Sequence, residues 1–162
     1  MLKIHHLGHS QSERILWLCE ELDIPYELEK YKRDSVTRLS PPELKAKHPL
    51  GAAPLIEIDG MMLAESGAIV EYILARYGRG RLQHGPDHPE FAAYLYWFHF
   101  SNGNLQPAML RSMVVGRCGL APDHPVVASV RERLDKVLAL IESRLGLSPY
   151  LAGSELTAAD IM

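Results

Sequence analysis

Hydrophobic and polar positions in the first part of the chain predict strands and a helix in turn. Residues 2–6 are short and partly apolar and residues 26–31 alternate in polarity, which predicts two strands. Between them, apolar residues recur at helical spacing on one broad face: Ile15, Leu16, Leu18, Cys19 and Leu22. Pro25 ends this helix. The pattern predicts a β-α-β unit.

A hairpin and a second helix complete the first half of the chain. Pro41-Pro42-Glu43 predicts a short helix with proline in its first turn. Residues 54–63 form two apolar runs around Asp59-Gly60, which predicts a β-hairpin. From Glu65 to Gly78, apolar residues again recur at helical spacing. Alternating strands and helices over residues 1–78 indicate an α/β domain with a small mixed sheet.

The second half of the chain is helical in pattern. Residues 79–87 are rich in Gly, Pro and charge and predict a linker. Residues 88–116 carry one or two apolar helical segments, and residues 125–147 form an amphipathic helix. Thr157-Ala-Ala-Asp160 is a capping box that opens a last helix. Because so short a helix is unstable alone, residues 88–162 are expected to form an all-α domain that is incomplete at its C-terminal end.

Composition narrows the possible partners. The chain has 162 residues and a net charge of −3, so no basic field indicates nucleic acid or an anionic membrane as partner. The longest apolar stretches are too short to span a bilayer, and the start has no charged region followed by an apolar one. The two cysteines, Cys19 and Cys118, form no CxxC pair, which indicates a reduced cytoplasmic protein.

Hydroxyl groups stand at the start of both helices of the α/β domain. Ser10 and Ser12 begin the first, where Ser10-x-x-Glu13 also reads as a capping box, and Glu65-Ser66 begins the second. A helix N-terminus attracts anions through its dipole and its unpaired N–H groups. Each hydroxyl therefore either caps its own helix or binds an anionic ligand, and the residues alone leave both readings open.

Pro54 opens the first strand of the hairpin. An X-Pro bond costs only ~0.5–1 kcal/mol to hold cis, and a cis bond would turn the peptide groups of Ala53 outward toward an extended ligand. The alternative is a trans proline that begins an edge strand. The eight histidines show neither an HxxxH pair nor Cys/His ligand spacing, so no metal site is expected. Cys19 falls mid-helix on the apolar side and is expected in the core.

Four stretches, in this order and spacing, resemble the glutathione transferase family over nearly the whole chain: SQSER with the following ILWLCEELDIPYE, then HPLGAAPLIEIDG, LAESGAIVEYILARYG and YLAGSELTAADIM. The resemblance implies a thioredoxin-like N-terminal domain, an all-α helical C-terminal domain, a cis Pro54 and a cytoplasmic homodimer. It implies conjugation of glutathione, as co-substrate and without a cofactor, to small apolar electrophiles, as in detoxification.

The resemblance also implies a role for particular residues. Ala53, next to Pro54, would bind the main chain of the cysteinyl unit, and Glu65 and Ser66 would hold the γ-glutamyl ammonium and carboxylate. Ser10 would stabilise the attacking thiolate, with Ser12 as the alternative. The electrophile pocket would be lined from the first helix of the second domain, with these candidates: Tyr96, Phe100, Asn102, Gln106, Pro107 and Leu110.

The chain departs from the family pattern at Ala52, where Lys, Arg or Gln often meets the glycyl carboxylate. His48 and Arg14 are the candidates to supply that contact, and the first loop has no catalytic tyrosine. Two other functions stay open. A glutathione-dependent thiol reductase or isomerase would need Cys where Ser10 and Ser12 stand. A non-catalytic binding or regulatory module would use the same fold without turnover.

Overall fold

A four-stranded mixed sheet with strand order β2-β1-β3-β4 organises the N-terminal half of the computed structural model, which describes all residues, 1–162. Strand β1 (Leu2–Leu7) pairs in parallel with β2 (Tyr26–Tyr31). On its other side β1 pairs antiparallel with β3 (Leu55–Ile58), which forms a hairpin with β4 (Met61–Ala64). The predicted β-α-β unit and hairpin are confirmed.

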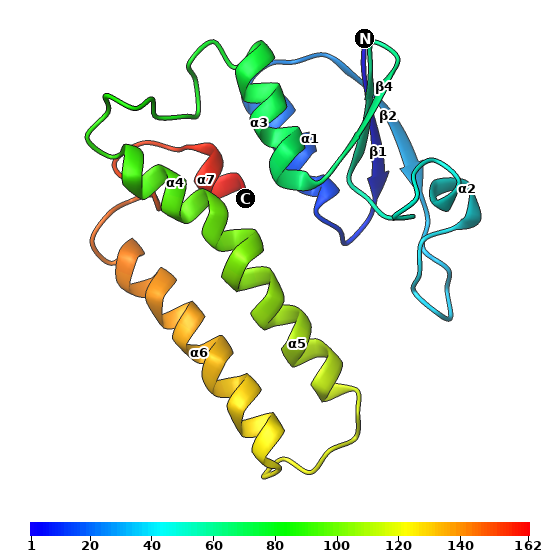
Figure 1. The fold of residues 1–162 in the computed structure, drawn as a ribbon, viewed down its shortest axis with the longest axis vertical. Helices are drawn as coiled ribbons and strands as arrows, with labels where there is room; N and C mark the ends of the chain where they lie inside the picture. The colour runs from blue at the N-terminus through cyan, green and yellow to red at the C-terminus, as the bar shows by residue number, and fades with distance from the viewer. The chain divides into compact units, whose positions relative to one another are not determined.

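Helices cover both faces of this sheet (Figure 1). Helices α1 (Ser12–Glu21) and α3 (Ser66–Tyr77) pack against each other on one face, and the short α2 (Pro42–Lys45) lies on the other. Fully buried apolar side chains come from the sheet and both long helices: Ile4, Ile15, Leu18, Cys19, Ile56, Ile69, Val70 and Ile73. Burying one such side chain stabilises the fold by about 1.5–3 kcal/mol. A smaller cluster of Leu7, Leu44 and Leu55 fixes α2.

The start of α1 differs from the expected Ser10–Glu13 capping box. The Ser10 Oγ accepts the Ser12 N–H (3.2 Å), while the Glu13 Oε1 accepts the N–H of His9 (3.0 Å) instead of that of Ser10. His9 has a φ of 56°, and this left-handed turn brings its N–H within reach of Glu13. The N-cap residue is Gln11, which makes no side-chain cap. The capping prediction was therefore wrong, and the Ser10 hydroxyl points into a side-chain network described below.

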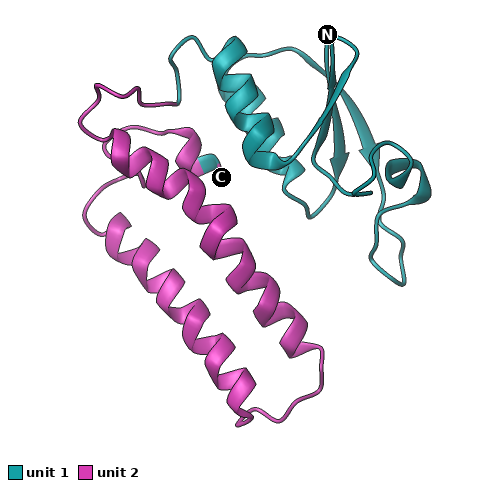
Figure 2. Ribbon diagram, viewed as in Figure 1, with its two compact units in different colours: residues 1–82, 161 teal, residues 83–160, 162 magenta.

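The chain divides into two compact units, residues 1–82 with 161 and residues 83–160 with 162 (Figure 2). The second unit begins with α4 (Phe91–Phe100), which runs through a π-helical segment (Ser101–Leu105) into α5 (Gln106–Gly116). Helix α6 (Pro125–Leu145) packs along α5. Aromatic side chains of α4 are buried: Tyr94, Trp97, Phe98 and Phe100.

The last helix, α7 (Ala158–Ile161), begins with the predicted capping box. The Thr157 Oγ1 accepts the Ala159 N–H (3.2 Å), and the Asp160 carboxylate accepts the Thr157 N–H (2.9 Å). The other oxygen of Asp160 accepts the N–H of Leu151 (2.7 Å), which ties the preceding loop to the helix. None of the helices combines the length and the apolar content that crossing a bilayer requires.

Candidate functional site

The peptide bond between Ala53 and Pro54 is cis, as the resemblance implies. Pro54 is buried, and the ladders of β3 begin only at Leu55, which pairs with His5 on β1 and Ala64 on β4. Ala53 is partly exposed and lies outside both ladders. Its peptide groups therefore stand at the open end of the hairpin, beside the residues that start α3.

Glu65 adopts a backbone conformation that few residues other than glycine adopt. Its φ of 72° and ψ of 116° lie in the left-handed half of the map, and the side chain is exposed. Such outliers persist where the surrounding structure holds them, and they concentrate at functional sites. Directly after it, Ser66 is the first residue of α3 and is 1% exposed. The turn thus puts a carboxylate outside and a hydroxyl inside at one helix N-terminus.

A small cavity of about 90 Å³ joins these two features. Its lining comes from the start of α1, the loop before β3 and the start of α3: Gln11, Leu50, Ala52, Ala53, Pro54, Ala64, Glu65 and Ser66. All four residues that the family resemblance assigns to glutathione binding lie in this lining. Residues from the α1 start and the α3 start, more than fifty positions apart in the chain, meet at one place because α1 and α3 pack on the same face.

The Ser66 hydroxyl takes part in a network that the sequence did not indicate. Its Oγ donates to the Gln11 Oε1 (2.7 Å) and accepts from the Arg14 Nη1 (3.2 Å). Arg14 is 8% exposed, and burial lowers the pKa of its guanidinium, which stays charged at neutral pH. Arg14, a candidate for the glycyl end, thus lies at the predicted γ-glutamyl end. A charged residue on the buried face of α1 was the signal in the sequence.

The two serines of the first loop occupy different environments. The Ser12 Oγ is fully buried and lies close to the main chain of Leu7 (3.2 Å from its nitrogen), to the Ser10 Oγ (2.8 Å) and to the His6 Nδ1 (2.9 Å). The Ser10 side chain is only half-buried. Ser10 is thus the more accessible of the two, but neither serine lines the small cavity, and the role of either in catalysis stays a prediction.

His6 belongs to this group but was not singled out from the sequence. It lies near the end of β1, and along a strand every second residue shares a face, so His6 follows the buried Leu2 and Ile4. A polar residue that closes an apolar face was the available signal. Burial lowers the pKa of His6, with the charge of Glu13 acting against this and the charge of Lys30 adding to it.

The electrophile-pocket candidates lie along one continuous helical stretch of the second unit. The rings of Tyr96 and Phe100 are in contact, with centroids 5.6 Å apart; Tyr96 is exposed, whereas Phe100 is buried against Trp97. Asn102 is exposed on the π-helical segment, and Gln106 is half-buried at the start of α5. Pro107 and Leu110 follow in α5, half-buried and exposed respectively, and a shared role for these six residues stays a prediction.

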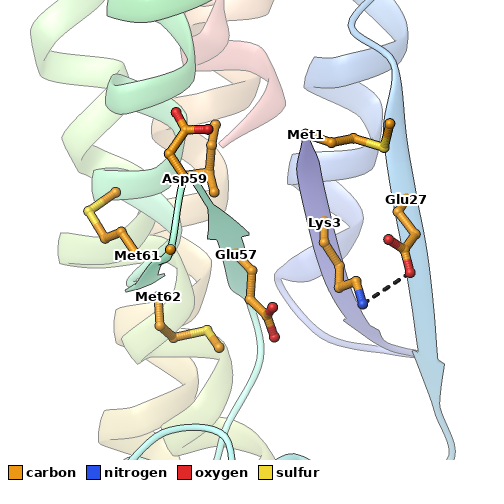
Figure 3. Close-up of a pocket in the computed structure, with 9 residues that line it drawn as sticks. Met1, Lys3, Glu27, Glu57, Asp59, Met61 and Met62 are labelled. Atoms are coloured by element: carbon orange, nitrogen blue, oxygen red, sulfur yellow. Dashed lines mark ion pairs between the residues drawn. The ribbon is translucent and has the colours of Figure 1, made fainter.

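A larger depression of about 520 Å³ lies elsewhere on the first unit (Figure 3). Its lining comes from all four strands and from the turn between β3 and β4: Met1, Lys3, Glu27, Glu57, Ile58, Asp59, Gly60, Met61 and Met62. Lys3 pairs there with Glu27 (3.0 Å), as Figure 3 shows, while Glu57 and Asp59 add further carboxylates to the lining. None of the candidate residues lies in it. Size alone therefore does not identify the site, and we assign it to the smaller cavity.

Cys19 is confirmed as a core residue. It is fully buried in the middle of α1, and burial, with the nearby charge of Glu20, raises the pKa of its thiol to about 12. A thiol with this pKa is almost entirely protonated at neutral pH and is a poor nucleophile. No group of three or more His, Cys, Asp and Glu side chains is arranged to hold a metal ion.

Comparisons with known proteins identify the family of the chain. Residues 2–75 match the model of the glutathione S-transferase N-terminal domain, and residues 87–162 match that of the C-terminal domain. Glutathione S-transferase 3 of Schizosaccharomyces pombe is 34% identical, over 99% of this chain and 70% of the relative. Glutathione S-transferase 1 of Saccharomyces cerevisiae is 30% identical, over 100% of this chain and 77% of the relative.

A solved structure supports the same assignment. The crystal structure of a glutathione S-transferase from Actinobacillus pleuropneumoniae superimposes with a TM-score of 0.89 at 31% identity, over 99% of this chain and 74% of that one. The fold class is therefore confirmed as a thioredoxin-like domain followed by a helical domain. The chain belongs to the glutathione S-transferase family and is a transferase enzyme of that family.

Proposed function

We propose that the cavity lined by residues 53, 54, 65 and 66 binds glutathione, and that Ser10 stabilises its thiolate for attack on a small apolar electrophile. The observation that carries the proposal is the convergence of the cis Ala53–Pro54 bond and the Glu65-Ser66 turn on one cavity. The cavity accepts one end of a tripeptide, and the rest of the ligand would run past Ala53 toward Ser10.

The charges of the cavity suit the γ-glutamyl end of glutathione. Its carboxylate would lie at the N-terminus of α3, where N–H groups and the helix dipole favour an anion. The guanidinium of Arg14, bonded to Ser66, adds positive charge at the same place. The exposed carboxylate of Glu65 would meet the ammonium group. Ala52 offers no charge to the glycyl carboxylate, so we expect that end to bind loosely.

Catalysis would consist of keeping the bound thiol ionised and oriented. Lowering a thiol pKa from about 8.5 to about 6.5 requires roughly 2.7 kcal/mol of preferential stabilisation of the thiolate. One charge-assisted hydrogen bond from Ser10 contributes ~1.5–3 kcal/mol, and the dipole of α1 up to ~1 kcal/mol. These contributions suffice without a covalent intermediate on the protein.

The two alternatives are less well supported. A reductase or isomerase that acts through a protein thiol needs a reactive cysteine at the start of α1, and Cys19 is buried in its middle with a raised pKa. A non-catalytic binding module needs only the cavity. A binding module of this kind would bind glutathione without changing the pKa of the glutathione thiol. A homodimer and a cytoplasmic location also remain our predictions, and sedimentation equilibrium checks the first.

One titration separates these functions. The thiolate absorbance of glutathione is followed against pH with the protein in excess, for the parent and for Ser10→Ala. We expect a bound thiol pKa lowered by about two units in the parent and returned most of the way in the variant. Binding that leaves the thiol pKa of glutathione unchanged would favour the binding module. Absence of glutathione binding would refute the proposal.

A further inference from the structure

A hydrogen-bonded row of side chains leads from β1 to the first loop of the candidate site. The His6 Nδ1 lies 2.9 Å from the Ser12 Oγ, and the Ser12 Oγ lies 2.8 Å from the Ser10 Oγ. Ser12 is fully buried, while His6 and Ser10 at the two ends are half-buried. The row therefore connects a titratable ring to the hydroxyl proposed to meet the thiolate.

As long as the Ser12 hydrogen stays within the row, the bonding capacity of Ser12 allows two arrangements. A hydroxyl donates one hydrogen and accepts two, and the Leu7 N–H already occupies one acceptor position (3.2 Å). If Ser12 accepts from His6, its hydrogen goes to Ser10. If it accepts from Ser10, its hydrogen goes to His6. The Leu7 carbonyl is a weaker competitor at 3.3 Å.

The two arrangements differ in where the Ser10 hydrogen points. In the first, every donor points outward, and the Ser10 hydrogen is left for a group beyond the loop. In the second, the Ser10 hydrogen points inward to Ser12, and Ser10 presents only an acceptor. The first suits a thiolate and the second suits a protonated thiol. Which one exists depends on whether the His6 Nδ1 carries a proton.

We propose that His6 is a positioning residue that acts through Ser12, directing the Ser10 hydroxyl at the thiolate and receiving the thiol proton. The inference rests on the proposed function and deepens it. In one step, the glutathione S–H proton moves to the Ser10 Oγ, the Ser10 proton to the Ser12 Oγ, and the Ser12 proton to the His6 Nδ1. The S–H bond breaks and an N–H bond forms. The imidazolium then releases its Nε2 proton to water.

The surroundings of His6 suit this cycle. Its Nε2 makes no hydrogen bond within the protein, and the half-buried ring leaves a route to solvent. Glu13 on α1 stabilises the imidazolium, and Lys30, the partner of His6 across the strand pair, opposes it. Burial lowers the pKa of His6, which favours loss of the second proton. The neutral ring that remains carries its hydrogen on Nδ1, so all donors now point toward the thiolate.

The competing explanation is that the row only ties β1 to α1. Ser12 does this through Leu7 in any case, so removing His6 would then change stability and leave the chemistry of a bound thiol untouched. A readout specific to the thiol therefore separates the two. Bound-thiol pKa, measured in the whole chain by thiolate absorbance, is such a readout.

The test uses His6→Ala, His6→Asn and a matched control, His9→Asn. His9 is exposed, its side chain makes no hydrogen bond in the structure, and Asn tolerates its positive φ. His6→Ala is expected to raise the bound-thiol pKa by about one unit, a tenfold change in proton affinity. His6→Asn keeps an N–H near the Nδ1 position and is expected to restore most of the shift, and His9→Asn to behave as the parent.

A double-mutant cycle shows whether His6 acts through Ser10. In the Ser10→Ala background, His6→Ala is expected to cause no further shift. Nitrogen NMR of the His6 ring gives a second readout, with a change of tautomer from Nε2–H to Nδ1–H when glutathione binds. If the parent lowers the thiol pKa and His6→Ala lowers it equally, the inference about His6 is overturned and the proposed function stands. A parent that binds glutathione without lowering its thiol pKa, or fails to bind it, would overturn the proposed function as well.

Discussion

Ser66 shows how one side chain connects the fold to the candidate site. Its hydroxyl joins Gln11 before α1 and Arg14 within α1 to the start of α3, so it helps hold two helices in register. The same hydroxyl lines the cavity. A bound γ-glutamyl carboxylate would replace the Gln11 oxygen as its acceptor, so ligand binding exchanges one hydrogen bond for a charge-assisted one.

At this scale we predict that Ser66→Ala weakens glutathione binding about tenfold, because one charge-assisted hydrogen bond is lost, worth about 1.5 kcal/mol. Isothermal titration calorimetry measures the change. Ser154→Ala is the matched control, since Ser154 is exposed in the second unit and makes no hydrogen bond through its side chain. Equal affinities of the two variants would contradict a role for Ser66 in the site.

Among the elements, α7 depends most on its cap. It spans four residues, too few for a stable helix on propensity alone. Asp160 compensates by accepting the N–H of Thr157 and the N–H of Leu151 with its two oxygens. One carboxylate thus accepts an N–H at the start of the helix and an N–H of the loop before it. The stability of this end of the chain therefore depends on Asp160.

We therefore predict that Asp160→Ala lowers the free energy of unfolding by about 2–3 kcal/mol, through the lost cap and a partly buried N–H left without an acceptor. Urea unfolding followed by circular dichroism measures it. Asp135→Ala, at an exposed position of α6 without hydrogen bonds, is the comparison and should stay within about 0.5 kcal/mol of the parent. A similarly small effect of Asp160→Ala would refute the role of the cap.

Features that depend on neighbouring residues could be predicted from the sequence, whereas contacts that form only when helices pack could not. The strand at residues 26–31 and the Thr157–Asp160 box were predicted at their observed positions, because alternation and capping involve neighbours in the chain. The Gln11–Ser66–Arg14 network was not predicted, since it forms only when α1 and α3 pack together. The predicted Ser10–Glu13 capping box was wrong because His9 has a positive φ, which the local pattern does not reveal. The Glu13 carboxylate therefore accepts the N–H of His9 instead of that of Ser10.

At the scale of the whole molecule, both units contain a histidine whose charged form is disfavoured by folding. Burial lowers the pKa of His6 in the first unit. In the second, burial, followed by the charge of His88, lowers the pKa of His84, whose ring stacks on that of His88 at 3.7 Å. A histidine with a lowered pKa in the folded state binds its proton more readily when unfolded. Acid therefore favours the unfolded state in both units.

Because both histidine pKa values are lowered in the folded state, the free energy of unfolding depends on pH in a defined range. Above the ordinary histidine pKa of 6.5 both states are neutral and stability is full; as pH falls through 6.5 the unfolded state binds more protons, and stability declines. We predict that His84→Phe, which keeps ring contacts to His88 and Tyr94, flattens this decline between about pH 7 and 5. Urea midpoints across this range measure it, with the value at pH 8 as each variant's reference. An unchanged slope would contradict the assignment to His84.

The π-helical segment Ser101–Leu105 sets the phase of everything that follows it in α5. Its sequence, SNGNL, consists mostly of small polar residues, which are typical of loops that tolerate deletions. Each residue of a helix turns the next by about 100°, so a deletion there would rotate α5 by more than a quarter turn and carry the face that packs on α6 into solvent. Single-residue deletions should therefore be tolerated in the loop between α5 and α6 but not in this segment.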